Sequence, residues 1–136
     1  MAVHTLLSES IATAVTGVTP DPVKLDRFAD YLAIEAIFLY GAGGTNATAY
    51  VQTSLDGGTT WFDIASFQFT TSAASKVSAL TTGIAPGTQA FTPGDGALTA
   101  NTVINGVLGD RFRAKLTTTG TYTGATSLAV HIVTRG

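Results

Sequence analysis

Residues 54–61 read Ser54-Leu55-Asp56-Gly57-Gly58-Thr59-Thr60-Trp61, and this run predicts a β-hairpin. Gly57 and Gly58 supply the positive φ angles of a tight turn, because glycine has no Cβ to clash with the backbone. The Asp56 carboxylate is placed to accept hydrogen bonds from the amides of the turn. Threonine and tryptophan favour strands, so a strand restarts here, and we expect Trp61 to be a buried core residue.

The segments around this turn have the composition and alternation of strands. Residues 47–55 place alternate apolar side chains on one face, and residues 61–69 follow the turn with three phenylalanines. Residues 31–40 also fit an approximate helical stripe, but their aromatic and β-branched content and the glycine-rich turn at 41–44 favour a strand. Together the three segments predict a three-stranded meander.

The C-terminal part alternates most regularly. Phe112, Ala114 and Leu116 alternate with polar residues, and a second alternating segment covers residues 128–135. These segments predict a second hairpin, joined through residues 119–125. With Arg113 opposite His131, its outward face would carry a candidate docking surface of basic residues around that histidine: Arg111, Arg113, Lys115, His131 and Arg135. The alternative is an ordinary solvated face.

The remaining segments complete an all-β prediction. Residues 70–109 are rich in glycine and proline, with strands expected near 76–80 and 102–107, and their low charge suggests that this connection lies against the rest of the protein. Residues 1–24 end at Thr19-Pro20-Asp21-Pro22 and form an extended N-terminal arm or an edge strand, ahead of a single domain at 25–136. About eight strands and no helix predict an antiparallel β-sandwich or jelly roll, with a barrel as the alternative.

Composition narrows the function. The 136 residues contain 7 basic and 9 acidic residues, which is 12% charged, against about 25% in an average soluble domain. Either neighbouring subunits cover this weakly charged surface, or threonine, serine and glycine do. The net charge of −2 argues against a nucleic-acid partner, and the longest apolar run, residues 31–40, is too short to span a membrane and contains Glu35. No cysteine is present, so disulfides are excluded, and the N-terminus lacks the basic segment of a signal peptide.

The residues that carry chemistry are few. His4 and His131 have no metal-ligand partner at a recognisable spacing, and Ser54 and Ser66 have no base in a known motif. We therefore predict no catalytic, cofactor-binding or metal-binding residues, and we expect that the protein is not an enzyme.

The spacing Ser54-x-Asp56-x-Gly58-x-Thr60-Trp61 resembles the Asp-box, a hairpin motif of sialidases. In that family the box is structural and repeats once per propeller blade, whereas this sequence contains one. The resemblance implies a hairpin and no hydrolase activity.

Two longer segments carry a second resemblance. Residues 47–70, ATAYVQTSLDGGTTWFDIASFQFT, and residues 109–135, GDRFRAKLTTTGTYTGATSLAVHIVTR, resemble small β-rich structural proteins of tailed bacteriophages and gene-transfer particles. The resemblance implies a virion component, most specifically a capsid decoration or cement protein on the outer surface of the phage head, assembled in the host cytoplasm. Its implied partners are further copies of itself, as a trimer, and the major capsid protein. A tail or neck protein is the alternative.

A third interpretation belongs to another class. A carbohydrate-binding module would use Trp61, Tyr50 or Tyr122 as a stacking platform for a glycan. This interpretation requires the aromatic ring to be exposed.

Overall fold

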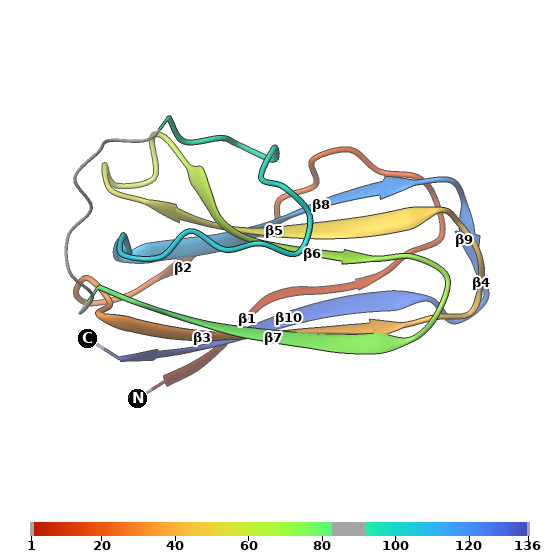
Figure 1. Ribbon diagram of the computed structural model, residues 1–136, viewed down its shortest axis with the longest axis horizontal. Helices are drawn as coiled ribbons and strands as arrows, with labels where there is room; N and C mark the ends of the chain where they lie inside the picture. Colours follow the sequence, from red (N-terminus) through yellow and green to blue (C-terminus); the bar gives the residue numbers. More distant parts are fainter. Residues whose placement is uncertain (1, 83–91, 136) are drawn as a thin grey trace.

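Two four-stranded antiparallel sheets pack face to face in the computed structural model, which describes residues 2–82 and 92–135 (Figure 1). Sheet A contains, in spatial order, β1 (Ala2–Ser10), β10 (Ser127–Arg135), β3 (Tyr31–Leu39) and β7 (Ala74–Thr81). Sheet B contains β2 (Val23–Lys24), β8 (Arg111–Thr119), β5 (Asn46–Ser54) and β6 (Phe62–Phe69). The short strands β4 (Ala42–Gly43) and β9 (Tyr122–Thr123) pair at one end. The predicted all-β sandwich is confirmed, whereas jelly-roll connectivity is not established.

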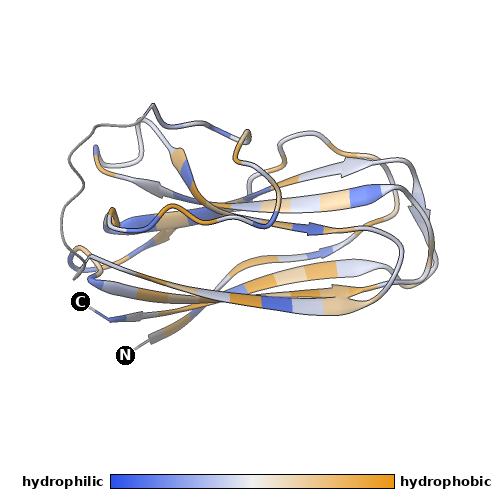
Figure 2. Ribbon diagram, viewed as in Figure 1, coloured by the Kyte–Doolittle hydropathy of each residue, from blue (hydrophilic) through white to orange (hydrophobic). Residues whose placement is uncertain are grey.

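The core lies between the two sheets, where apolar side chains from the strands of both sheets are buried together. In β3, β8 and β10 every second residue is buried. Hydrophobic residues follow the strands of both sheets (Figure 2). At one end of the core the Phe38 ring stacks on Phe69 with 5.2 Å between centroids and meets Tyr122 edge-on at 5.7 Å. Such aromatic pairs contribute about 0.5–1.5 kcal/mol beyond the burial of their area.

The chain changes sheets at most of its connections, and this corrects two predictions. The hairpin β5–β6 is confirmed, but β3 belongs to the other sheet, so the three-stranded meander is wrong. The C-terminal hairpin is also wrong, because β8 lies in sheet B and β10 in sheet A. Both predictions fail because the chain crosses between the sheets at a corner. There β4, which connects β3 to β5, pairs with β9, which connects β8 to β10 (Figure 1). Alternation identifies which face of a strand is buried and not which sheet the strand joins.

The N-terminal segment belongs to the sandwich. β1 pairs along its length with β10, with a bulge at Leu6 that turns both Leu6 and Leu7 into the core. The chain then crosses to sheet B, where Val18 bridges Leu116 and β2 pairs with β8. Residues 2–10 therefore form an edge strand of sheet A, and an extended N-terminal arm is not confirmed.

The described part of the long connection, residues 92–110, covers the free edge of β6. Ser66 N donates to Thr102 O at 2.9 Å, and Ile104 N donates to Ile64 O at 2.8 Å. The expectation that this connection lies against the protein is confirmed for these residues, and the strand expected near 76–80 is β7. The strand expected at 102–107 is reduced to one bridge, Ala65 with Val103, and the predicted loop at 83–91 lies outside the described residues. In the described ranges no helix is long and apolar enough to cross a membrane.

Candidate functional site

The 54–61 turn is held by its own side chains. Asp56 Oδ1 accepts from Thr60 N at 2.9 Å and from Ser54 Oγ at 2.9 Å, while Asp56 Oδ2 accepts from Thr60 Oγ1 at 2.6 Å. These hydrogen bonds, those from Thr60 foremost, lower the pKa of Asp56 to about 2. Gly57 and Gly58 have φ of 78° and 94°, as the turn requires. The predicted structural roles of these three residues agree with the geometry.

Trp61 does not occupy the predicted core position. It precedes β6, is only partly buried, and is not a member of the core cluster. Its indole Nε1 donates to Gly58 O at 3.1 Å, and the Arg113 guanidinium lies 4.5 Å from its ring centroid. Trp61 therefore packs on the outside of sheet B, because the register of β6 against β5 shifts at Ile64, between Trp61 and the inward-facing Phe67.

A polar network fills the outer face of sheet B beside Trp61. Gln52, fully buried on β5, donates through Nε2 to Asp63 Oδ1 at 2.8 Å and to Asp95 Oδ1 at 2.6 Å. Its Oε1 accepts from Arg113 Nε at 2.7 Å. Lys115 Nζ lies 2.9 Å from Asp95 Oδ1 and is the main cause of the lowered pKa of Asp95. Partial burial lowers the pKa of Arg113, against the opposing effect of the carboxylates of Asp95 and Asp63.

Asp63 anchors the long connection within this network. Its carboxylate is buried and accepts from the backbone amides of Gly96, Ala97 and Leu98 at 2.8–3.1 Å. Its own amide donates to Gly94 O at 2.8 Å. Because its carboxylate is buried and accepts from several backbone amides, Asp63 holds the 94–98 loop in place, and its role is structural.

The predicted docking surface is divided between the two sheets. Arg111, Arg113 and Lys115 lie on β8 in sheet B, whereas His131 and Arg135 lie on β10 in sheet A. The register assumed between Arg113 and His131 does not occur, because Arg113 lies opposite Gln52 and His131 lies opposite Glu35 and Thr5. A continuous basic stripe is therefore wrong.

Acidic side chains also lie close to two of these basic residues. Arg111 Nε lies 3.8 Å from Asp110 Oδ1, and Arg135 Nε lies 3.7 Å from Asp30 Oδ1. Arg135 further packs over the Tyr31 ring at 5.1 Å. Arg111 and Arg135 therefore each have an acidic neighbour within the chain.

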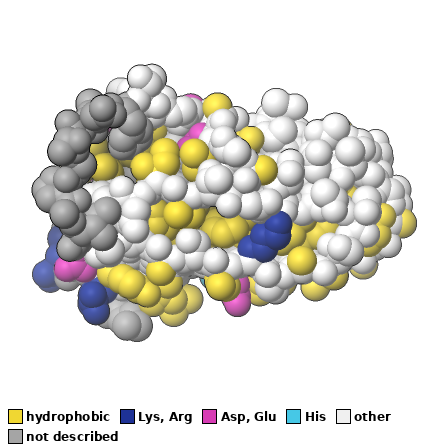
Figure 3. Space-filling view, viewed as in Figure 1, with side chains coloured by type: hydrophobic (Ala, Val, Ile, Leu, Met, Phe, Trp, Pro, Cys, Tyr) yellow, Lys and Arg dark blue, Asp and Glu magenta, His cyan; other side chains and the backbone are white. Residues whose placement is uncertain are grey.

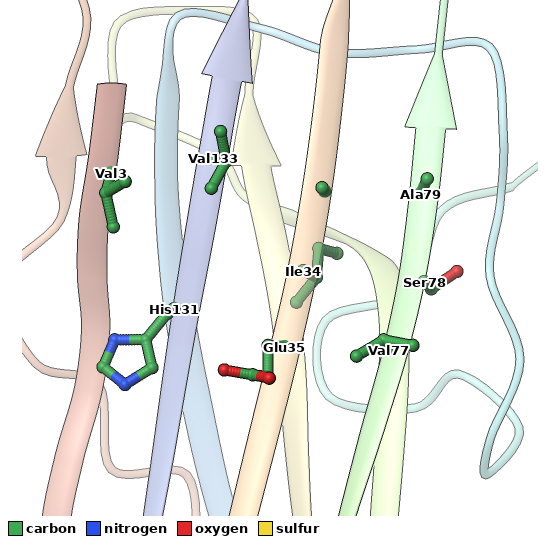
Figure 4. A pocket seen from close by; sticks show the side chains of 9 residues that line it. Val3, Ile34, Glu35, Val77, Ser78, Ala79, His131 and Val133 are labelled. Carbon is green, nitrogen blue, oxygen red and sulfur yellow. The ribbon is translucent and has the colours of Figure 1, made fainter. Parts of the chain in front are cut away.

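The outer face of sheet A is an exposed apolar surface, and we call it face A. It forms a shallow hollow of about 710 Å³ across all four strands (Figure 4). Val3 on β1 and Val77 on β7 are each 72% exposed at its two sides. Between them lie Ala33, Val133, Ala79 and two polar residues, Glu35 and His131. No described segment of the chain covers this face.

The polar pair on face A comes from neighbouring strands. His131 on β10 lies directly opposite Glu35 on β3, and Figure 4 shows both side chains projecting from the same face. The Thr5 hydroxyl lies 3.1 Å from His131 Nδ1. Catalysis would require further groups that converge in a cleft, whereas these two stand among valine and alanine on an open sheet. In residues 2–82 and 92–135 no group of three or more metal-ligating side chains occurs.

Of the three aromatic residues predicted as a platform for a glycan, not all are accessible. Tyr122 is fully buried and its hydroxyl donates to Thr70 O at 2.7 Å, so its role as a platform is wrong. Burial also raises the pKa of its hydroxyl. Trp61 has one ring face covered by Arg113. Tyr50 is partly exposed on the outer side of sheet B.

Sequence reasoning missed both Gln52 with its network and face A. The sequence of β10 could have indicated face A, because apolar residues point to both sides of this strand. Leu128, Val130 and Ile132 point inward, and Ala129 and Val133 point outward. Comparisons of the chain with protein-family models, with curated proteins and with solved structures find no match.

Proposed function

We propose that this chain is a non-enzymatic structural protein of a virion, and most specifically a capsid decoration protein that binds the outer surface of a phage head and stabilises it. The observation that carries the proposal is face A, an apolar four-stranded surface with Val3 and Val77 at 72% exposure. Contiguous exposed apolar patches of this kind are typical of interaction sites. The resemblance of residues 47–70 and 109–135 to phage structural proteins supplies the class of assembly.

The use of polar side chains supports a structural role. Asp56, Asp63 and Asp95 are engaged in hydrogen bonds that hold the hairpin turn and the 94–98 loop. Arg113 and Lys115 are bound within the same network. These groups stabilise a rigid frame that presents its outer surfaces.

The weakly charged surface supports many-copy assembly. Figure 3 shows one side of the molecule, where uncharged side chains greatly outnumber charged ones. Such a surface gives little repulsion between copies and suits contact with a protein shell. We propose that the partners are further copies of this chain and the major capsid protein.

Binding to shells tests the function. Purified protein is added to mature capsids that lack it, and bound protein is measured after sedimentation together with the melting temperature of the shells. We expect saturable binding and a higher melting temperature. Absence of binding, with unchanged melting, overturns the proposal, and binding in rings of six or twelve at the tail or neck assigns the protein to that part of the virion instead.

A further inference from the structure

The geometry points to a second copy of this chain as the occupant of face A, packed against it about a twofold axis that runs along the strands between β10 and β3. This inference rests on the proposed function, because a protein that works in an assembly has a surface that a partner covers. The inference identifies the partner that covers face A. It follows from the strand order, the sizes of the outward side chains and the position of the two polar groups.

The strand order makes face A self-complementary. In sheet A the order β1-β10-β3-β7 places two strands on each side of the line between β10 and β3. A twofold rotation about that line puts β10 over β3 of the other copy, and β1 over β7. Each residue of β10 then lies over its own register partner on β3 of the second copy, and a C2 interface of this kind is isologous.

The polar pair is matched by this rotation. His131 and Glu35 are register partners across β10 and β3, so His131 of one copy lies over Glu35 of the other, and the reverse. The polar groups of face A therefore meet each other twice at the centre of the interface. A twofold axis across the strands through the same row would instead bring Glu35 over Glu35 and His131 over His131.

Size is matched as well. On either side of the polar pair, Val133 lies opposite Ala33 and Ala129 lies opposite Ile37. The rotation places each large side chain over a small one of the second copy, which allows the two layers to interdigitate. At the sides of the face, the exposed Val3 meets β7 of the other copy, and the exposed Val77 meets its β1. Aligned sheets cross at about −30°, so this matching is closest in the central rows.

The area is sufficient for a pair. Strands about 4.8 Å apart with a rise of about 3.3 Å per residue give face A roughly 570 Å², and two copies bury about 1,100 Å². Specific interfaces begin at about 1,000 Å² of total buried surface. Sheet B offers less edge for pairing, because residues 101–104 cover the edge of β6 and residues 15–24 cover the edge of β8.

The pairing is tested with charge exchange in the purified full chain. Light scattering and sedimentation across a concentration series should give the wild type a mass of twice the 13.9 kDa of the chain. Glu35→Lys places lysine over His131, and His131→Glu places two carboxylates together, so each single variant should weaken pairing by at least about tenfold. The double variant places opposite charges across the axis and should pair within about threefold of the wild type.

Two further variants keep the result interpretable. Asp26→Lys makes the same charge change as Glu35→Lys at an exposed aspartate outside face A and should leave pairing unchanged. Val3→Lys places a charge at an exposed position of the face opposite Val133, away from the row of the polar pair, tests the apolar contact there, and should also weaken pairing.

Several outcomes would overturn the inference. A wild type with the mass of one chain at every concentration excludes the pair, and a mass of three chains replaces it with the trimer that the phage resemblance implies. Failure of the double variant to restore pairing excludes this axis. If the wild type is a single chain but Glu35→Lys loses binding to shells, face A docks on the capsid, so the pairing is wrong while the proposed function stands.

Discussion

The guanidinium of Arg113 lies over the indole ring of Trp61, with 4.5 Å between the guanidinium carbon and the ring centroid. The same side chain donates through Nε to Gln52 Oε1 at 2.7 Å, so one arginine joins the end of the hairpin turn to the middle of sheet B. Both contacts lie on the outside of the sandwich. This outer layer holds Gln52, Asp63 and Asp95 in place.

Replacement of Arg113 by glutamate should destabilise the fold. The Arg113→Glu variant loses a charge-assisted hydrogen bond and the contact with Trp61, and it places a carboxylate near Asp63 and Asp95. We expect the free energy of unfolding to fall by about 2–3 kcal/mol. Chemical denaturation monitored by circular dichroism measures this change.

The control for that variant is Arg27→Glu, which makes the same charge change at an exposed arginine. Its unfolding free energy should stay within about 0.5 kcal/mol of the wild type. Equal stability of Arg113→Glu and the wild type would show that the outer network contributes little and that Arg113 is free to dock a partner.

Trp61 is the single tryptophan, so its fluorescence reports directly on this layer. We expect acrylamide quenching between that of a buried and that of a free indole, because one face of the ring is covered by Arg113. Arg113→Ala should increase the quenching constant, whereas Arg27→Ala should not. Quenching of Trp61 at the level of free tryptophan, with protection by an added glycan, would instead support a carbohydrate-binding module.

Asp63→Asn should release the 94–98 loop. The carboxylate accepts from three backbone amides and from Gln52, and an asparagine side chain offers one acceptor oxygen and an amide group that faces donors. We expect a loss of about 2–4 kcal/mol of stability, since buried donors lose their partners. Amide hydrogen exchange should accelerate at Gly96, Ala97 and Leu98.

A matched variant separates this effect from the loss of a charge. Asp26→Asn removes the same charge from an exposed aspartate and should leave both stability and exchange at residues 96–98 unchanged. Slow exchange at Gly96 in Asp63→Asn would contradict the anchoring role of the carboxylate.

Local features were predictable from sequence where the determining interactions are local. The turn at Asp56 to Gly58 follows from glycine dihedrals and from a carboxylate that accepts hydrogen bonds from its own turn, and β5 and β6 follow from the strand-forming residues on either side of it. The sheet to which each strand belongs is set by contacts between residues far apart in the chain. β8 pairs with β5, and β10 pairs with β1 and β3, and alternation within β8 or β10 does not encode that choice.

The candidate site was predictable only in part for the same reason. The outward position of Arg113, Lys115 and His131 follows from the two-residue period of a strand. The prediction that they form one surface assumed that β8 pairs with β10, and these strands lie in different sheets. The partners of Arg113 come from β5 and from a loop residue, Asp95, whose position depends on the fold of residues 92–110 around Asp63. Face A requires the order of four strands that are distant in sequence.

Asp56 should make the stability of the hairpin depend on pH in the acidic range. Hydrogen bonds from Thr60 and Ser54 favour the carboxylate and lower its pKa from 3.8 to about 2 in the folded protein. Because the folded pKa lies below the unfolded one, the contribution of this group is fully present above pH 3.8 and is lost as the pH falls through 2. The difference in unfolding free energy between the wild type and Asp56→Asn should therefore shrink between pH 5 and pH 2.

A direct measurement is the carboxyl carbon chemical shift of Asp56 by NMR, with Asp21→Asn as the control for net charge, since Asp21 is exposed. A midpoint near 3.8 for Asp56 would mean that the bonds from Thr60 and Ser54 do not hold the carboxylate in solution.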